Sequence, residues 1–398
     1  MRPRIAVLSV LVSISVATLI GVSPTNVSSQ TEVRSALLFT STRDNPADPV
    51  HASELYLMLT TPGGAPDPTQ TFRLTQNVTG EGFATLSPDG KRIVFDSNRL
   101  RDTRRVNSSD LFVMSADDFE NPIPDGEQKH LTQGSSASWA PHGVRIAFHA
   151  SQSGNGTPLT GNAGSETSDS DIFTMNVNDC LDVIARNRVD DCREIAGPHV
   201  KNLTNNGSAT IDDDPDWSPD GRKIVYVRHA AQTTNQFAPD AEIYVMRVDP
   251  DGTPVQDGTE NPQRLTFNSA PSVLDQDKIE ERGPTWSPDG QHIAYACRLG
   301  VRPPGPGANQ GGKTFKICVM DADGNNQITL TTGTSEFTPT WSPDGKQIVF
   351  HGLNNPSQLF ILDLRFDQDG AITGGTPQQL TFGSSANGIA SWGMVRTR

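Results

Sequence analysis

The feature that most constrains the fold of this sequence is a five-residue motif, Trp-Ser-Pro-Asp-Gly, that recurs along the chain. Complete copies begin at Trp217, Trp286 and Trp341. Weaker copies begin at Leu86 and Trp139, and a truncated copy is centred on Trp392. All five tryptophans of the chain occupy this one position of the motif. Such regular placement indicates a repeat protein, and it decides the fold before any other feature does.

The spacing of the motif predicts the size of the repeating unit. Successive anchor residues are separated by 53, 78, 69, 55 and 51 positions, which is a unit near fifty residues with insertions. Each unit contains four short strand signals, and Pro-Asp-Gly forms a tight turn after the first. In the third complete unit, the second, third and fourth strands are expected at 224–226, 243–246 and 265–266.

The two ends of the chain complete the repeat count. Residues 36–41, 54–59 and 73–75 match the second, third and fourth strands of a unit, and they lack a first strand. The C-terminus offers a lone first strand around Trp392. We therefore predict an all-β fold, a six-bladed β-propeller of four-stranded antiparallel blades. Pairing of the C-terminal strand with the N-terminal strands closes the ring and removes the open sheet edge.

The N-terminus has the features of an export signal. Arg2 and Arg4 precede an apolar stretch at 5–20, and small residues follow, with Val27 and Ser29 suited to a cleavage site. We assign 1–29 to a signal peptide and 30–398 to a single propeller domain, exported to the periplasm or secreted. The alternative is an uncleaved membrane anchor. No later stretch is apolar enough to span a membrane.

The charge of the chain excludes some classes of partner. The formal net charge is −14, and removal of two arginines with the signal would make it −16. Such a surface repels nucleic acid and anionic lipid, so neither is an expected partner. It leaves cations or basic partners as ligands, and we expect a monomer with no membrane span in the mature chain.

The four cysteines fit an exported protein. Cys180 and Cys192 bracket one insertion, and Cys297 and Cys318 lie on neighbouring predicted strands. Neither pair has the Cys-x-x-Cys spacing of a metal site. We expect two structural disulfides, Cys180–Cys192 and Cys297–Cys318, with free buried thiols as the alternative.

Acidic residues recur five positions before the anchor of the motif, at Glu81, Asp212, Glu281 and Glu336. Because the innermost strand of each blade lines the central channel, we expect these side chains to form a partial ring at one mouth. They could receive a ligand, or they could orient the connection between blades by accepting backbone or arginine hydrogen bonds. A third interpretation is a Ca²⁺ site, for which Asp212 and Asp214 are weak candidates; no other cofactor is expected.

Two histidines occupy equivalent places just after the second strand, His149 and His351, and Asp96 stands at the same place in another unit. Their side chains should lie near the same mouth, where they add to the candidate ligand-binding set. A His/Asp pair can act as a general acid and base. No nucleophile or third partner is evident, so ordinary surface or hydrogen-bonded histidines are the alternative.

These motifs resemble the TolB-like propeller repeat, over roughly residues 36–396. The resemblance implies the six-bladed fold, and it implies a mouth that receives a basic peptide tail. TolB also carries an α/β domain before its propeller, and we expect that domain to be absent here. The same propeller precedes the hydrolase domain of prolyl-oligopeptidase-like enzymes, but no Gly-x-Ser-x-Gly nucleophile motif is found in this sequence.

Two functions remain in competition at this stage. The first is an exported, non-enzymatic binding or scaffold propeller that recognises a protein, a peptide or a small ligand at the channel mouth and the loops of that face. The second is a propeller enzyme, a polysaccharide lyase or glycoside hydrolase, that uses Asp96, His149 and His351 with Arg228 or Arg298. No residue is assigned as catalytic.

Overall fold

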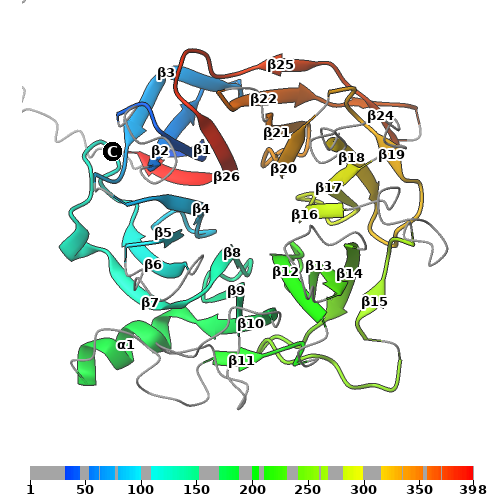
Figure 1. The fold of residues 1–398 in the computed structure, drawn as a ribbon, viewed down its shortest axis with the longest axis horizontal. Helices are drawn as coiled ribbons and strands as arrows, with labels where there is room; N and C mark the ends of the chain where they lie inside the picture. Colours follow the sequence, from blue (N-terminus) through cyan, green and yellow to red (C-terminus); the bar gives the residue numbers. More distant parts are fainter. Residues whose placement is uncertain are drawn as a thin grey trace, which may run out of the picture.

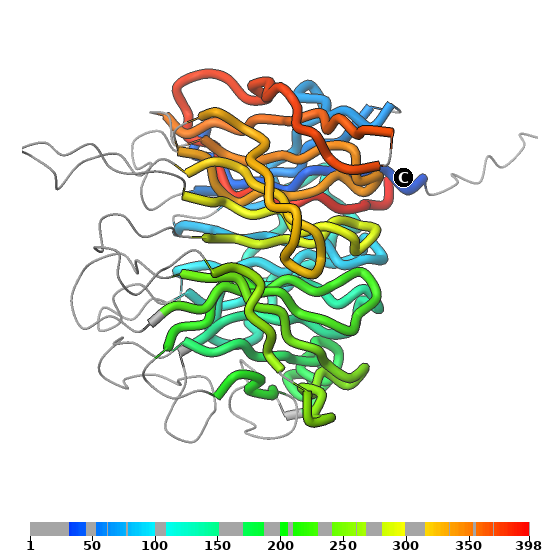
Figure 2. The backbone as a smooth tube through the Cα atoms, turned by 90° about the vertical axis from the view of Figure 1, so that its right-hand side faces the viewer, coloured from blue at the N-terminus to red at the C-terminus, as the bar shows by residue number. Residues whose placement is uncertain are grey.

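A computed structural model gives the fold as a ring of six antiparallel sheets around a central channel (Figure 1). Figure 2 shows the ring edge-on, with the strands crossing it from one face to the other. The structure describes residues 32–44, 53–61, 63–76, 79–99, 109–151, 170–187, 200–205, 210–230, 241–259, 261–267, 281–298, 315–333, 335–352, 356–368 and 370–397. The expected signal peptide lies outside these residues.

Blades 1 to 5 each have four strands that follow the order of the chain, and the first strand of each blade is the innermost. Blade 1 contains β4 (Glu81–Leu86), β5 (Arg92–Ser97), β6 (Asp110–Ser115) and β7 (Lys129–Gln133). Blade 2 contains β8 (Ser135–Trp139), β9 (Arg145–Ser151), β10 (Ser170–Asn176) and β11 (Val200–Asn202). Blade 3 contains β12 (Thr210–Trp217), β13 (Lys223–Ala230), β14 (Glu242–Arg247) and β15 (Gln263–Arg264).

The remaining blades follow the same plan. Blade 4 contains β16 (Glu281–Trp286), β17 (His292–Arg298), β18 (Phe315–Asp321) and β19 (Ile328–Thr329). Blade 5 contains β20 (Glu336–Trp341), β21 (Gln347–Gly352), β22 (Gln358–Asp363) and β25 (Pro377–Gln379), with a small hairpin, β23 (Arg365–Phe366) and β24 (Ile372–Gly374), before its last strand. A short 3₁₀ turn, η1 (Asp125–Glu127), precedes β7.

The sixth blade joins the two ends of the chain. Its innermost strand is β26 (Asn387–Thr397), which pairs with β1 (Glu32–Ser41), followed by β2 (Glu54–Thr60) and β3 (Pro66–Arg73). The β1–β26 register runs from Glu32 opposite Thr397 to Ser41 opposite Asn387. The predicted fold class and its mode of closure are therefore confirmed.

The Pro-Asp-Gly turns are scaffold, as the sequence predicts. In the four copies that keep Ser-Pro-Asp-Gly, the glycine adopts φ between +68° and +71°, which disfavours any residue with a side chain. The serine hydroxyl donates to the aspartate at 2.5–2.7 Å, and the aspartate accepts the backbone N–H two residues later. His142 replaces the aspartate in blade 2, and its Nδ1 accepts the N–H of Val144 in the same way.

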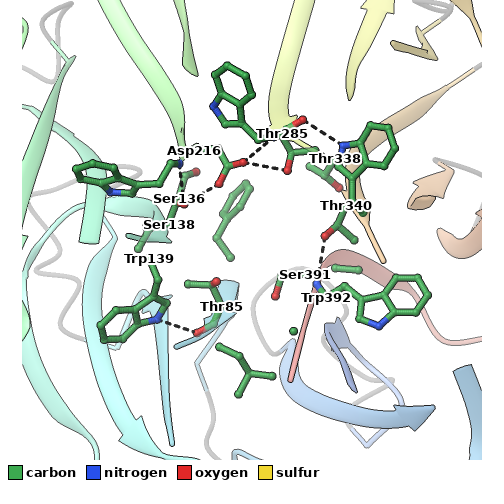
Figure 3. Close-up of a pocket in the computed structure, with 18 of the residues that line it drawn as sticks. Thr85, Ser136, Ser138, Trp139, Asp216, Thr285, Thr338, Thr340, Ser391 and Trp392 are labelled. Atoms are coloured by element: carbon green, nitrogen blue, oxygen red, sulfur yellow. Dashed lines mark hydrogen bonds between the residues drawn. The ribbon is translucent and has the colours of Figure 1, made fainter. Parts of the chain in front are cut away.

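A belt of hydrogen bonds around the channel ties every blade to the next (Figure 3). It lies one residue before the tryptophan of each blade, or before Leu86 in blade 1, and its side chains are Thr85, Ser138, Asp216, Thr285, Thr340 and Ser391. Asp216 accepts from Ser138 at 2.6 Å and from Thr285 at 3.0 Å, so one carboxylate joins blades 2, 3 and 4. The other boundaries are bridged by Trp139 Nε1 to the Thr85 carbonyl, Trp341 Nε1 to the Thr285 carbonyl, the Trp392 N–H to Thr340 Oγ1, and Ser391 Oγ to the Ala84 carbonyl.

One helix, α1 (Val177–Asn187), lies in an insertion of the fold that the sequence predicts to be all-β. Its apolar residues Val177, Cys180, Leu181 and Ile184 follow helical spacing and pack against the core of blade 2. The Asn176 side chain caps it by accepting the N–H groups of Asn178 and Asp179. Both signals are present in the sequence, but eleven residues inside an insertion are easily assigned to a loop. No helix among the described residues has the length and apolar character needed to cross a membrane.

Candidate functional site

The four repeat acids do not line the channel mouth. Glu81, Asp212, Glu281 and Glu336 are 3%, 0%, 0% and 8% exposed, and their side chains lie at the boundaries between blades. Strict strand alternation would place them on the channel face, together with the belt residues four positions later. A β-bulge interrupts every innermost strand between these two positions, so the alternation is broken and the acids turn away from the lumen.

Two of the acids clasp an arginine against a pair of aromatic rings. Asp212 accepts from Nε and Nη2 of Arg228 at 2.7 and 2.9 Å, and the guanidinium lies over Tyr226 and Tyr244. Glu81 accepts one hydrogen bond from Nη2 of Arg99 at 2.9 Å, and this guanidinium lies over Phe95 and Phe112. In blade 6, Arg43 lies over Phe39 and Tyr56 and reaches the amide oxygen of Asn387, which stands in the acid's place.

The other two acids each contact a threonine that follows the last strand of the preceding blade. Thr331 donates to Glu336, and Thr266 lies within 3.5 Å of Glu281 while it donates to Glu242 at 2.5 Å. Burial raises the pKa of Glu336. These contacts are what the second interpretation predicts, in which the acids orient the connection between blades. Whether any of the four also contacts a ligand stays a prediction.

In blade 4 a disulfide occupies the place of the arginine clasp. Cys297 aligns with Arg228 of blade 3, and Cys318 aligns with Tyr244. The predicted Cys297–Cys318 bond is present, with Cα atoms 5.8 Å apart. Cys180 is also disulfide-bonded, and its expected partner, Cys192, lies outside the described residues.

The mouth that the acids were expected to line is formed by other residues. An open cavity of about 450 Å³ lies at this end of the channel. His149 and His351 line it as predicted, and so does Asp214. Sequence reasoning missed most of the others, and the full lining is Phe83, Ser135, Ser136, His149, Asp213, Asp214, Arg282, Gly283, Phe337, Thr338, His351 and Ile389.

The bulges supply five of these lining residues in an uncommon backbone conformation. Ser136, Asp214, Gly283, Thr338 and Ile389 have φ between +40° and +53°, in the left-handed region. Glycine and aspartate tolerate this region, but a β-branched residue there is strained, at a cost of about 1–3 kcal/mol. Strain repeated around one ring of the molecule shows that the bulge is held by the packing of the blades.

A sequence signal for the bulge exists. Proline follows the bulged residue in blades 3, 4 and 5, at Pro215, Pro284 and Pro339. Proline cannot donate a hydrogen bond to its neighbouring strand, so inside a strand it marks a bulge or an edge. That pattern, placed two residues before a tryptophan, could have identified the mouth-lining residues.

The charged groups of the mouth gather around Asp213. Asp213 lies 3.1 Å from His229 Nε2 and 3.9 Å from His149 Nε2. Burial raises the pKa of Asp213, but His149, His229 and Arg282 together outweigh it and lower the pKa below its ordinary value. Asp213 is therefore an ionised carboxylate shared by two imidazoles. The Asp214 N–H donates to His149 Nδ1 at 3.4 Å, which joins blade 2 to blade 3.

His351 has a different environment. Burial lowers its pKa to about 4, so the ring is neutral above that pH. It hydrogen-bonds Thr338 at 2.6 Å and stacks on Phe337, whose ring also contacts Phe315. A neutral, buried imidazole holds the bulge of its own blade and contributes an apolar surface to the mouth.

Asp96 gives a pH-dependent prediction. Burial raises its pKa from 3.8 to about 6, although Ser135 donates a hydrogen bond to it and His149 is near. The folded protein thus binds more protons than the unfolded chain between about pH 4 and 6, so Asp96 lowers the free energy of unfolding as pH rises through this window. We expect Asp96→Asn to be more stable than the wild type at pH 7, by up to about 3 kcal/mol, and equal to it at pH 4. Urea unfolding at both pH values measures the two free energies of unfolding. If the difference between variant and wild type were the same at pH 4 and pH 7, the prediction would be wrong.

The described residues contain no group of three or more histidine, cysteine, aspartate or glutamate side chains arranged to hold a metal ion. Of the two weak candidates, Asp212 is bound to Arg228, and Asp214 lies in the mouth, two residues along the strand. A Ca²⁺ ion takes six to eight oxygen ligands, which these two side chains alone do not provide.

Comparison with solved structures identifies the type of propeller. Over 90% of the chain, the structure is similar to TolB from Acinetobacter baumannii, with a TM-score of 0.55 and 18% sequence identity. The fold is that of a TolB-like β-propeller. The matched part covers 66% of that TolB chain, which is less than two thirds of its length. At this identity the similarity establishes the fold alone.

A second solved structure shares the fold. A chain of the nidogen/laminin complex matches 90% of this chain and 98% of its own length, with a TM-score of 0.51 and 9% identity. No protein-family model matches the sequence, and the search of curated proteins finds no significant match. The TolB-like propeller is thus recognised through its structure and its repeat motif.

Proposed function

We propose that this chain is an exported, non-enzymatic binding propeller that holds a protein, peptide or small ligand at the channel mouth. The observation that carries the proposal is the 450 Å³ cavity at that mouth, which combines ionised groups with aromatic and aliphatic side chains. Ligand sites are typically concave, mostly apolar and furnished with a few placed polar groups. The nidogen/laminin complex contains a chain of similar fold, which is consistent with a binding role.

Export is part of the same proposal. The basic and apolar start of the chain has the pattern of a signal peptide, and disulfides persist in oxidising compartments such as the periplasm or the cell exterior. The Cys297–Cys318 bond joins two neighbouring strands of blade 4, so it stabilises the domain itself.

Two of the residues that the enzyme alternative requires have other roles in the structure. Arg228 is engaged by Asp212 and lies over two tyrosines, so it belongs to a clasp within blade 3. His351 is neutral and hydrogen-bonded to Thr338. His149 beside Asp213 is the remaining pair with acid–base character, and a base needs a substrate proton within hydrogen-bond reach. We therefore favour binding.

A pair of substitutions tests the placement of the ligand. Ile389→Asn removes an apolar side chain from the mouth, and asparagine suits the left-handed backbone at that position. Phe382→Ser is the control, because Phe382 is 73% exposed and lies beyond the outer strand of blade 5. With ligand captured from the native extract, we expect binding about five- to tenfold weaker for Ile389→Asn and unchanged for Phe382→Ser. The opposite pattern would place the ligand on the rim and overturn the proposal.

A further inference from the structure

Below the mouth, the channel wall carries charge of one sign only. A second cavity of about 450 Å³ follows the lumen along all six innermost strands. Among the described residues that line it, the charged side chains are Asp214 and Asp216, and none is basic. Arg282 and His149 lie at the mouth above. A lumen with acidic groups and low-dielectric walls concentrates a negative potential.

The two carboxylates are not equivalent. Asp216 belongs to the belt, where Ser138, Thr285 and the N–H of Trp286 donate to it at 2.6–3.0 Å. These bonds satisfy both carboxylate oxygens, so the role of Asp216 is structural. Burial raises its pKa above the ordinary value.

The carboxylate of Asp214 accepts fewer hydrogen bonds than that of Asp216. Its Oδ1 accepts one hydrogen bond, from Ser136 Oγ at 3.0 Å, and the described residues make no ion pair with it. The adjacent Asp213, by contrast, is paired with His229. Asp214 lines both the mouth and the lumen, so its carboxylate stands where the two cavities meet.

The wall opposite Asp214 is apolar. In a ring of six blades, blade 3 faces blade 6, and β12 and β26 lie across the channel from each other in Figure 1. The lining residue of blade 6 at this level is Ile389, and Phe83 of blade 1 lines the same cavity. The cavity therefore offers a ligand at Asp214 both an aliphatic and an aromatic side chain. Aromatic faces attract cations as well as apolar groups.

We propose that the ligand enters the channel with a primary ammonium group on an apolar stem, which binds the carboxylate of Asp214. This inference rests on the proposed function and names the chemical class that the same site takes. An ammonium carries three donors, which suit a carboxylate with an open oxygen, and its stem packs on Ile389 and Phe83. A lysine side chain of a protein partner and a free alkylamine share this chemistry.

The test uses benzylamine as the probe and benzyl alcohol as its neutral counterpart, with binding followed by NMR titration of the full chain. We expect saturable binding of benzylamine by the wild type and weaker binding of benzyl alcohol. Asp214→Asn should weaken benzylamine binding about tenfold or more, because it removes a charge-assisted hydrogen bond. Asparagine is nearly isosteric and tolerates the φ of +51° at this position, so the fold should persist.

Glu120→Gln provides the matched control, since Glu120 is an exposed acid on the outside of blade 1 and its loss changes the net charge equally. It should leave benzylamine affinity unchanged. Equal loss in both variants would mean nonspecific attraction to an acidic protein, and no loss in Asp214→Asn would exclude the site. Binding of Ca²⁺ without any binding of benzylamine would identify a metal site instead. Each of these three results overturns the inference.

Two further arms identify the source of the amine. The peptide acetyl-Leu-Lys-Leu-amide is compared with its norleucine analogue, and tighter binding of the lysine peptide than of benzylamine indicates a protein partner. Failure of this inference is distinguishable from failure of the proposed function. If the captured native ligand is weakened by Ile389→Asn but not by Asp214→Asn, the mouth binds a ligand that carries no amine at this position.

Discussion

A chain that lacks residues 387–398 is expected to lose cooperative folding altogether. This truncation removes β26, which pairs with β1 along its whole length and is the innermost strand of blade 6. It also removes the belt bonds on both sides of that blade. The edge of β1, whose residues Ala36–Phe39 are fully buried in the closed ring, would then face water. Exposed strand edges pair with other chains, so aggregation should follow.

Thermal or urea unfolding monitored by tryptophan fluorescence measures the effect, because four tryptophans remain after the truncation. Trp392→Ala serves as the control, since it keeps the β1–β26 ladder and removes only one partly buried side chain. It should unfold cooperatively, with a free energy of unfolding lower by roughly 2–4 kcal/mol. A truncated protein with a wild-type transition would show that the ring stays folded without its closing strand.

The second large effect is expected for Asp212→Ala, with a free energy of unfolding about 3–5 kcal/mol lower than that of the wild type. Asp212 is fully buried and binds Arg228 through two hydrogen bonds. Removal of the carboxylate leaves the guanidinium near Tyr226 and Tyr244 without its anion, and that desolvated charge carries the cost. Urea unfolding at pH 7 is the measurement.

Asp257→Ala is the matched control for Asp212→Ala. Asp257 also binds its arginine, Arg247, through two hydrogen bonds of 2.7 and 2.8 Å, but this pair is exposed to solvent. Exposed ion pairs contribute little, so the midpoint of unfolding should stay close to that of the wild type. The double variant Asp212→Leu/Arg228→Met should recover much of the lost stability. If Asp212→Ala were as mild as the control, the clasp would have no structural role and Asp212 would return to the ligand-binding candidates.

The fold was predictable because its signals are local and repeated. The Trp-Ser-Pro-Asp-Gly turn depends on a glycine at positive φ and on a serine that contacts the aspartate two residues later, so each copy carries its own structure. Closure by β26 followed from counting strands at the two ends. The Cys297–Cys318 bond followed from the strand assignment.

The mouth was less predictable because a bulge reverses which side chains face the channel. Glu281 and Arg282 are neighbours in sequence, but the first is buried at a blade boundary and the second lines the mouth. A shift of one residue cannot be derived from alternation alone, since alternation assumes an unbroken strand. His149 and His351 were placed at the mouth correctly because they lie near the end of the second strand, whose pairing with the third strand has no bulge.

The order of synthesis gives the closing seam a further significance. Ser35 accepts a hydrogen bond from Trp392, although the two residues are 357 positions apart in the chain. The first blade to begin is therefore the last to be finished, and its three early strands must wait until almost the whole chain has been made. Contacts of such sequence separation form slowly. Completion of this ring is thus timed by the synthesis of β26, and a helper that shields the waiting strands would act before β26 is made.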